Sequence, residues 1–213
     1  MLLVTSHGFK MNIVLATTNK KKIEEIKKIF GPMDTASKIY TLDDFPAMED
    51  VVEDGDTFEA NAIKKAKQIA SATGMTALAD DSGLAVDALD GAPGVYSARY
   101  AGEDADDKAN NDKLLDALKD IPDEKRGAQF VCCIALVSAE ETNTFMGYVK
   151  GRIGTEPKGA SGFGYDPLFY PEGSIKTFAE MGAKDKNAIS HRANALRELQ
   201  QYLLTKRGYI RGF

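Results

Sequence analysis

Residues 75–89, MTALADDSGLAVDAL, decide the fold, because they set two adjacent carboxylates between two apolar runs. We expect strands over 76–80 and 84–89, with a polar turn between them. Successive side chains of a strand point to opposite faces, so Asp80 and Asp81 cannot share one environment if the strand continues through them. One can then hold structure while the other faces a cleft. Carboxylates at such a strand end favour a ligand site, although the same run also fits an ordinary polar turn.

The composition bounds the class of protein. The 213 residues are 43% hydrophobic and 28% charged, which is typical of a soluble globular chain with one domain or two closely joined lobes. The net charge of -5 argues against a general nucleic-acid coat or an anionic membrane surface. The first convincing strand begins near Met11. We therefore expect residues 1–10 to be an N-terminal extension and residues 11–213 to form a single domain.

The chain lacks the signals of a membrane or secretory segment. No apolar run approaches the roughly 20 residues that span a bilayer, and the first ten residues lack the long apolar core of a signal peptide. Cys132 and Cys133 are adjacent in an apolar run, where neighbouring side chains point oppositely, so no disulfide between them is expected. We expect both thiols to pack in the core of a cytoplasmic protein, in a reducing compartment.

Strand and helix patterns are interspersed, so we expect an α/β fold with a mixed sheet flanked by helices. Apolar residues recur at helical spacing in residues 20–30, where Gly31 and Pro32 provide a stop. Asp56 and Glu59 are a plausible capping box for the next helix. The other expected elements are a strand over 12–16, a helix over 104–119, paired strands over 129–138 and 144–153, a glycine-rich loop over 158–166, and a closing helix over 191–206.

The first polar constellation follows the opening strand. Free backbone amides at a helix start, aided by the helix dipole, make an anion site. Several lysines at that position oppose the dipole, and a bound polyphosphate would relieve the conflict. A solvated lysine face with an asparagine cap is the alternative, and the missing glycines exclude a Walker loop. The residues are Thr17, Thr18, Asn19, Lys20, Lys21 and Lys22.

The second constellation is Glu53 with Asn61 and Lys65. Asn61 and Lys65 are four residues apart, so they share one face of the expected helix. Glu53 precedes that helix in a stretch rich in carboxylates. A solvated acidic loop is the alternative interpretation.

The third constellation is the glycine-rich segment 161–167, SGFGYDP. Glycines let a backbone approach a planar ligand closely, and Phe163 or Tyr165 could stack on a base. The alternative is a tight turn anchored by its aromatic residues.

The fourth constellation is Lys186 with Ser190, His191 and Arg192, at the start of the closing helix. Cationic side chains there are unfavourable to the helix dipole unless an anion or an acceptor lies nearby. A helix cap with exposed side chains is the alternative.

Taken together, the four segments hold cations for phosphates, oxygen ligands for a hard divalent metal, and a ring for a base. This inventory fits a nucleoside triphosphate with magnesium better than a substrate of single charge. The cations are Lys22, Lys65, Lys186 and Arg192, the oxygen ligands are Glu53, Asp80 and Asp81, and the ring is that of Phe163.

The chain resembles the inosine triphosphate pyrophosphatase (Ham1-like) family, from about Asn12 to the closing helix. Six motifs in the same order carry the resemblance. They are Thr17-x-Asn19-x-x-Lys22; Thr57-Phe58 with Asn61-Ala62 and Lys65-Ala66; Ala79-Asp80-Asp81-Ser82-Gly83-Leu84; Pro93-Gly94-x-Tyr96-Ser97-Ala98-Arg99-Tyr100; Gly162-Phe163-Gly164-Tyr165-Asp166-Pro167; and Ser190-His191-Arg192. The sequence departs from the family at Thr18, where many members have glycine, and at Ala60, often glutamate. The metal assignment therefore rests on Glu53.

The resemblance implies an elongated mixed sheet with helices, in two lobes with the active site in the cleft between them. It implies hydrolysis of ITP, dITP and XTP to the monophosphate and pyrophosphate, and a homodimer with residues 94–100 as candidate interface. On this basis Asp81 is the expected general base, and Glu53, Asp81 and Asp80 are the expected Mg²⁺ ligands. The expected nucleotide contacts are Thr17, Thr18, Asn19, Lys20, Lys21, Lys22, Lys65, Ser82, Phe163, Gly164, Tyr165, Asp166, Lys186, His191 and Arg192.

Two competing functions have discriminating features. A Maf-type nucleotide pyrophosphatase would share a related fold, but the segments around Phe163 and His191 argue against it. A nucleotide-binding module without catalysis would not need the acidic set of Glu53, Asp80 and Asp81. Pyrophosphate release across a panel of nucleotides, with and without magnesium, separates the three.

Overall fold

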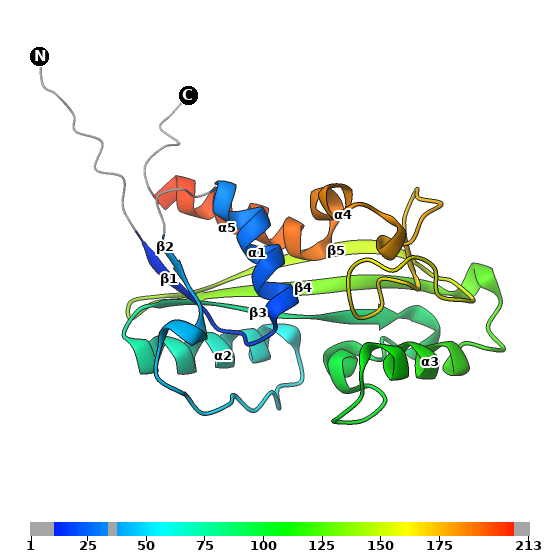
Figure 1. Ribbon diagram of the computed structural model, residues 1–213, viewed down its shortest axis with the longest axis horizontal. Helices are drawn as coiled ribbons and strands as arrows, with labels where there is room; N and C mark the ends of the chain where they lie inside the picture. Colours follow the sequence, from blue (N-terminus) through cyan, green and yellow to red (C-terminus); the bar gives the residue numbers. More distant parts are fainter. Residues whose placement is uncertain (1–10, 34–37, 207–213) are drawn as a thin grey trace, which may run out of the picture.

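A six-stranded sheet forms the centre of the computed structural model, which describes residues 11–33 and 38–206 (Figure 1). The strand order is β2-β1-β3-β4-β5-β6, with β1 parallel to β2 and β3 and the later pairs antiparallel. The predicted mixed sheet is confirmed, while residues 1–10, the predicted extension, lie outside the described residues. The strands are β1 (Asn12–Leu15), β2 (Lys38–Tyr40), β3 (Thr76–Val86), β4 (Gly127–Val137), β5 (Thr142–Ile153) and β6 (Phe169–Pro171).

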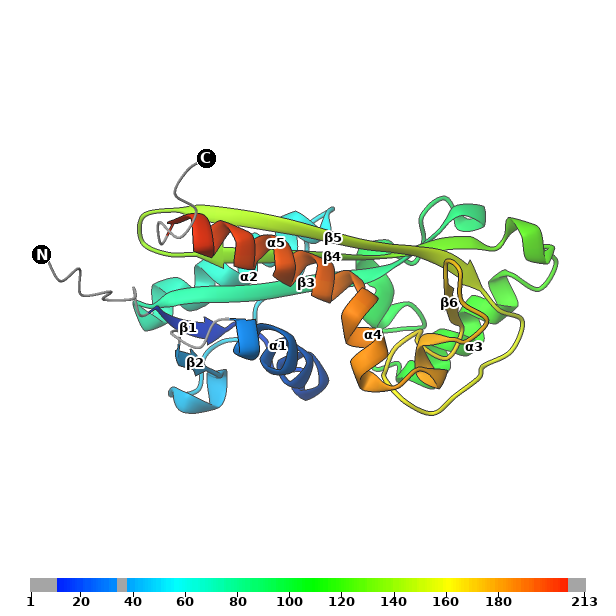
Figure 2. The same cartoon turned by 90° about the horizontal axis from the view of Figure 1, so that it is seen from above.

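Helices cover both faces of the sheet. In Figure 1, α1, α4 and α5 lie on one face, and α2 and α3 lie on the other. Figure 2 shows the elongation, because β3, β4 and β5 run from the end that carries β1 and β2 to the end that carries α3. The mixed α/β class is the one that the sequence patterns predict, and the elongation is what the family resemblance implies. The helices are α1 (Lys20–Met33), α2 (Phe58–Thr73), α3 (Asp107–Ala117), α4 (Ala183–Ile189) and α5 (His191–Lys206).

The apolar core is divided between the two ends of the sheet. At one end, α1 and α5 pack on one face through residues such as Leu196, and α2 packs on the other through residues such as Ala66. At the far end, a separate cluster gathers Leu84 of β3 with Leu114 of α3 and Phe178. The polar residues of β3 lie between these two parts of the core. The paired carboxylates of β3 therefore lie between the two parts of the core.

Strand β3 is longer than the sequence predicts, and the expected turn at the paired carboxylates is wrong. The strand runs unbroken from Thr76 to Val86, and a 3₁₀ turn follows at Asp87–Leu89. Its ladder with β4 is continuous, with Asp80 opposite Ile134 and Asp81 opposite Cys133. The polar run remains a strand because β4 satisfies its backbone groups and each face of the sheet offers partners to its side chains.

Smaller differences concern element ends and short elements. Helix α1 continues past the predicted stop to Met33. The cap of α2 is Thr57, whose hydroxyl accepts from the amide of Ala60 at 3.0 Å, and not Asp56. Strands β2 and β6 and helix α4 are not predicted. Each is short, and β2 owes its pairing to β1, a neighbour that local sequence does not reveal.

The two cysteines behave as the sequence predicts. Both thiols are free and buried, Cys132 in the cluster under α1 and α5 and Cys133 in the cluster under α2. They therefore lie on opposite faces of β4 and serve as core side chains. Within the part of the chain that the structure describes, no helix has the length and apolar character needed to cross a bilayer.

Candidate functional site

Asp80 faces the side of the sheet covered by α1 and α5, where cations surround it. Its carboxylate lies 2.5 Å from Lys22 Nζ and 2.9 Å from Arg192 Nε, and the Cys132 thiol donates to it at 3.0 Å. Burial by itself raises the pKa of Asp80, but Arg192 and Lys22 outweigh burial and hold that pKa well below its usual range. Asp80 is thus a paired carboxylate, ionised at neutral pH, that joins β3 to α1, α5 and β4.

Asp81 faces the opposite side of the sheet, toward α2. Its carboxylate lies 2.7 Å from Lys65 Nζ, and Glu53 lies 3.1 Å from the same ammonium. Burial raises the pKa of Asp81 to about 6, although Lys65 and Lys22 act to lower it. Burial also acts to raise the pKa of Glu53, but Lys65 and the neighbouring Asp81 lower it by more. The two carboxyl groups and Lys65 form a compact acid–ammonium triad.

This triad lines a cleft of about 710 Å³ together with the start of α1. The cleft is also walled by residues 42–51 and by the 3₁₀ segment η3 (Gly94–Arg99). The start of α1 is capped by Asn19, whose Oδ1 accepts from the amide of Lys22 at 3.1 Å. The structure therefore brings these predicted residues to one cavity: Thr17, Thr18, Asn19, Lys22, Glu53, Lys65, Asp81 and Ser82.

The three lysines at the start of α1 point to different places. Lys22 turns inward to Asp80, as its ion pair shows. Lys21 pairs with Asp107 at 3.3 Å and does not line the 710 Å³ cleft. Lys20 is exposed and does not line it either. Of the three, only Lys22 is placed beside the triad.

The residues predicted to read a base gather around Phe163. Cationic groups face its ring, with Lys186 Nζ at 5.0 Å and Lys21 Nζ and Arg192 Cζ both at 5.7 Å from the centroid. Asp166 is buried, accepts from the Phe163 amide at 2.9 Å and pairs with Lys186 at 2.6 Å. Burial raises the pKa of Asp166, opposed by Lys186. A hollow of about 240 Å³ opens beside Phe163 and Lys186.

The glycine-rich loop holds this arrangement by backbone geometry. Gly162 has a φ of +78°, and a Cβ there would come within 2.0 Å of the Asp166 carboxylate, so only glycine fits. The Gly164 carbonyl accepts from Asn111 at 2.9 Å. Tyr165 is buried in the core and donates its hydroxyl to the Ser97 carbonyl at 2.9 Å. Of the two aromatic residues considered for stacking, the structure leaves Phe163 beside the hollow and places Tyr165 in the core.

His191 is buried and neutral. Its ring stacks on Phe130 with centroids 4.7 Å apart, and burial followed by the charge of Arg192 holds its pKa well below the usual range. Its Nδ1 has no hydrogen-bond partner among the described residues. Ser190 caps α5 by accepting from the Ala193 amide at 3.2 Å, which matches the cap interpretation, but these side chains are buried and not exposed.

Glu25 joins the groups beside Phe163 to α1, and it is absent from the residues predicted from the sequence. Its carboxylate lies 2.8 Å from Lys186 Nζ and also pairs with Arg192. The residue lies three positions after Lys22, on the same helix face, which is the one pattern that could have revealed it. Through Glu25 and Asp80, a chain of buried and partly buried charges of alternating sign runs from Lys22 to Lys186.

The carboxylates of the cleft fit a hard divalent cation. Mg²⁺ is held in proteins by one or two carboxylates and completes its shell with water and substrate phosphates, and Glu53 and Asp81 supply two such groups beside the cleft. Asp80 lies across the sheet, engaged with Lys22 and Arg192, so it does not join them. Among the described residues, no three acidic, imidazole or thiol groups form a closed metal cage.

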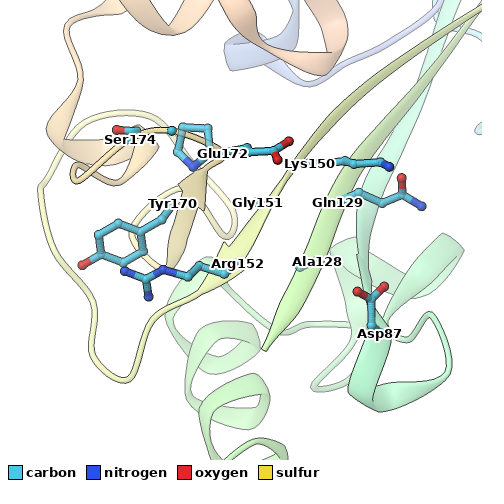
Figure 3. A pocket seen from close by; sticks show the side chains of 11 residues that line it. Asp87, Ala128, Gln129, Lys150, Gly151, Arg152, Tyr170, Glu172 and Ser174 are labelled. Atoms are coloured by element: carbon cyan, nitrogen blue, oxygen red, sulfur yellow. The ribbon is translucent and has the colours of Figure 1, made fainter. Parts of the chain in front are cut away.

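A further hollow, of about 650 Å³, lies away from all of these residues. It is formed by β4, β5 and β6 at the far end of the sheet, and Figure 3 shows the Arg152 guanidinium beside the Tyr170 ring. Lys150 and Glu172 add opposite charges to its exposed wall (Figure 3). None of the residues predicted to bind nucleotide or metal lines it, so the 710 Å³ cleft is the candidate site.

The fold and the site define a mixed α/β protein with carboxylates and cations paired on both faces of its central strand β3. The chain belongs to the Ham1 family, whose model matches residues 13–202. It is 52% identical over 192 residues to a dITP/XTP pyrophosphatase of Geobacter sulfurreducens, covering 90% of this chain and 96% of that protein. It is 48% identical over 191 residues to a dITP/XTP pyrophosphatase of Bacillus subtilis, covering 89% and 96%. The Ham1 protein of Staphylococcus aureus superposes with a TM-score of 0.82 at 44% identity, covering 92% and 99%.

Proposed function

We propose that this protein hydrolyses non-canonical purine nucleoside triphosphates, namely ITP, dITP and XTP, to the monophosphate and pyrophosphate. The observation that carries the proposal is the convergence of Glu53, Asp81 and Lys65 with the start of α1 in one cleft. Relatives about half identical over nearly the whole chain bear the name dITP/XTP pyrophosphatase, which supports the same substrate class. The reaction is hydrolysis of a phosphoric anhydride.

The triphosphate would lie between the start of α1 and Lys65. The amides and hydroxyls of residues 17–19 suit phosphate oxygens, and the helix dipole favours their charge. Lys22 is paired with Asp80, so it presents a cation that is already oriented beside the cleft. Preorganised charge of this kind is the main contribution of a protein to phosphoryl transfer.

Glu53 and Asp81 would hold Mg²⁺, the divalent ion that best matches carboxylate and phosphate oxygens. When bound, the ion neutralises charge on the phosphates and lowers the pKa of water in its shell. Lys65 already balances the two carboxylates, with its ammonium 2.7 Å from Asp81 and 3.1 Å from Glu53. This shared ammonium holds the two carboxylates close together, which reduces the cost of assembling the site.

Asp81 is the proposed general base. It takes a proton from the water that attacks the α-phosphorus, while the bond from that phosphorus to the bridging oxygen breaks and pyrophosphate leaves. A pKa of about 6, raised by burial, leaves Asp81 ionised at neutral pH and still basic enough to accept a proton. Asp80 cannot share this role, because Arg192 and Lys22 hold its pKa well below the usual range.

Base selection would depend on the groups around Phe163. Inosine and xanthosine carry an oxygen at purine C6, where adenine carries an amino group. Lys186 and Arg192 are buried donors beside the Phe163 ring, and each would donate to an oxygen and oppose an amino group. A buried donor facing a donor costs about 1–3 kcal/mol, or roughly tenfold to a hundredfold in selectivity. The Phe163 ring would stack on the purine without discriminating.

The test is pyrophosphate release from ITP, dITP, XTP, GTP, ATP and the pyrimidine triphosphates, with Mg²⁺ and with a chelator in its place. We expect turnover of the first three, dependent on Mg²⁺, and weak turnover of ATP. Equal kcat/KM for ATP and ITP would overturn the base-selection hypothesis. Preference for pyrimidine or methylated nucleotides would favour a Maf-type activity, and tight binding without turnover would favour a binding module.

We also propose that the chain works as a cytoplasmic homodimer, with residues 11–213 as a single two-lobed domain and residues 1–10 as an extension. The two free buried thiols suit a reducing compartment. Tyr96, on the segment 94–100, is 57% exposed, which suits an interface. Light scattering on the purified chain would give twice the monomer mass, and a strictly monomeric mass would exclude the dimer.

A further inference from the structure

The segment that carries Glu53 has little support of its own. Residues 47–55 form no helix or strand, and among the described residues they make no backbone-to-backbone hydrogen bond. Side chains from elsewhere hold the segment instead. Gln68 donates to the Glu49 carbonyl at 2.9 Å, and Arg99 Nη2 donates to the Glu53 carbonyl at 2.9 Å. Asn61 accepts from the Gly55 amide at 2.8 Å. Of these contacts, only that of Arg99 is made at the residue that faces Asp81 and Lys65.

Arg99 extends from a rigid support. The segment η3 is fixed through Ser97, whose hydroxyl accepts from the Leu84 amide of β3 at 2.9 Å. The Ser97 carbonyl accepts from the Tyr165 hydroxyl at 2.9 Å. The two elements meet so closely that a Cβ on Gly83 would come within 2.3 Å of the Ser97 hydroxyl. Arg99 is therefore anchored two positions from a contact with the strand that bears Asp81.

We propose that Arg99 is a positioning residue that holds Glu53 at the correct place for a divalent cation. This inference rests on the proposed function, because it concerns the cation that Glu53 and Asp81 would share. Arg99 lines the same cleft as both carboxylates. Arg99 Cζ lies 5.3 Å from the centroid of the Tyr96 ring, and Arg99 Nε lies 3.6 Å from the Glu103 carboxylate. In this position Nη2 of the guanidinium points to the Glu53 carbonyl. Partners that orient a metal ligand typically change metal affinity 10- to 100-fold when they are lost.

The sign of the effect separates positioning from simple electrostatics. Arg99 carries a positive charge beside a site for a positive ion. Removing that charge would by electrostatics alone strengthen cation binding. Removing the hydrogen bond to Glu53 would weaken cation binding, because the segment must then be ordered at the cost of binding free energy. A weaker affinity in the Arg99→Ala variant therefore has the opposite sign to the electrostatic effect, and it indicates lost positioning when a control change at the same segment leaves the affinity unaltered.

The experiment measures Mn²⁺ binding to the full-length chain by electron paramagnetic resonance, alongside the Mg²⁺ concentration for half-maximal pyrophosphate release. The variants are Arg99→Ala and Arg99→Lys. Gln68→Ala is the matched control, because it removes the same kind of hydrogen bond from the same segment at Glu49 and leaves Glu53 untouched. We expect about tenfold weaker Mn²⁺ binding for R99A, an intermediate value for R99K, and the wild-type value for Q68A.

Each other outcome overturns the inference in a distinguishable way. Unchanged or tighter Mn²⁺ binding by R99A, or equal weakening by Q68A, would show that Arg99 does not position Glu53. A lower melting temperature of R99A with unchanged Mn²⁺ affinity would make the role of Arg99 purely structural. If R99A does not fold, the same criteria apply to R99K. A wild-type chain that releases pyrophosphate without binding Mn²⁺ would defeat the inference alone. Absence of any hydrolysis would defeat the proposed function as well.

Discussion

The two faces of β3 treat adjacent, chemically identical residues in opposite ways. Asp80 lies among Lys22, Arg192 and a thiol, and these cations hold its pKa well below the usual range in spite of full burial. Asp81 has one close ammonium, shared with Glu53, and burial raises its pKa to about 6. The count of nearby cations, and not burial, separates the two. One face of β3 therefore anchors the fold, and the other keeps a carboxylate available for proton transfer.

The largest expected effect is on turnover, from Asp81→Asn. Asparagine keeps the shape but cannot accept a proton or bind a divalent cation as a carboxylate does, so pyrophosphate release should fall by at least roughly a thousandfold, or about 4 kcal/mol. The control is Asp54→Asn, which removes an exposed carboxylate paired with Lys64 and should leave turnover unchanged. Substantial residual activity in a folded D81N chain would remove Asp81 from the role of base.

The next effect is on stability, from Asp80→Asn. This change leaves Lys22 and Arg192 with a neutral partner in a buried place, and breaking a buried ion pair on one side costs about 3–5 kcal/mol. Urea unfolding should therefore show a much lower free energy of unfolding for D80N than for D81N. Similar stabilities for the two variants would mean that the faces of β3 do not differ as the ion pairs indicate.

Local patterns in the sequence predict the faces of β3 and the ends of the closing helix. Strict alternation along a strand puts Asp80 and Asp81 on opposite faces, and that holds because β3 continues through both. The closing helix is predicted with its true ends, since the apolar stripe repeats over 191–206. These successes share one cause: the information lies within a few residues of the element itself.

The rest depends on contacts between distant residues. Glu25 meets Lys186 and Arg192 across separations of 161 and 167 positions, so its spacing from Lys22 marks the helix face but does not reveal these two partners. The separation of Asp80 from Glu53 and Asp81 depends on which helices cover each face of the sheet. Tyr165 resembles a stacking residue in sequence, and only its packing in the core removes it from the hollow beside Phe163.

A third prediction uses pH to compare the faces. The pKa of Asp81 is raised in the folded chain from 3.8 to about 6, so its protonated form is favoured by folding. Its contribution to stability is present in full below pH 4 and is lost as pH rises through 6, by about 1–3 kcal/mol. Asp80, with a lowered pKa, contributes stability above pH 4 that is lost only on further acidification.

The measurement is urea unfolding of the wild type and D81N from pH 4.5 to pH 7.5, with a chelator present. The wild type should lose stability relative to D81N as pH rises, because asparagine does not ionise. Saturating Mg²⁺ should restore the stability that the wild type loses relative to D81N, because the cation stabilises the ionised form of Asp81. Parallel stability curves for the two chains across this range would show that Asp81 does not titrate as its burial indicates.

The smallest expected effect tests the two cysteines, which lie on the same two faces of the neighbouring strand. Cys132 donates its thiol to Asp80 at 3.0 Å, whereas Cys133 lies opposite Asp81 in the ladder and packs under α2. Cys132→Ala should therefore lose a hydrogen bond to a buried charge as well as packing, and Cys133→Ala should lose packing alone. The difference is about 1 kcal/mol, or roughly 2–4 °C in melting temperature for a chain of this size. Calorimetry on both variants measures this difference. Equal melting temperatures would mean that Lys22 and Arg192 alone satisfy Asp80. A lower melting temperature for C133A would mean that packing on the face of Asp81 contributes more to stability.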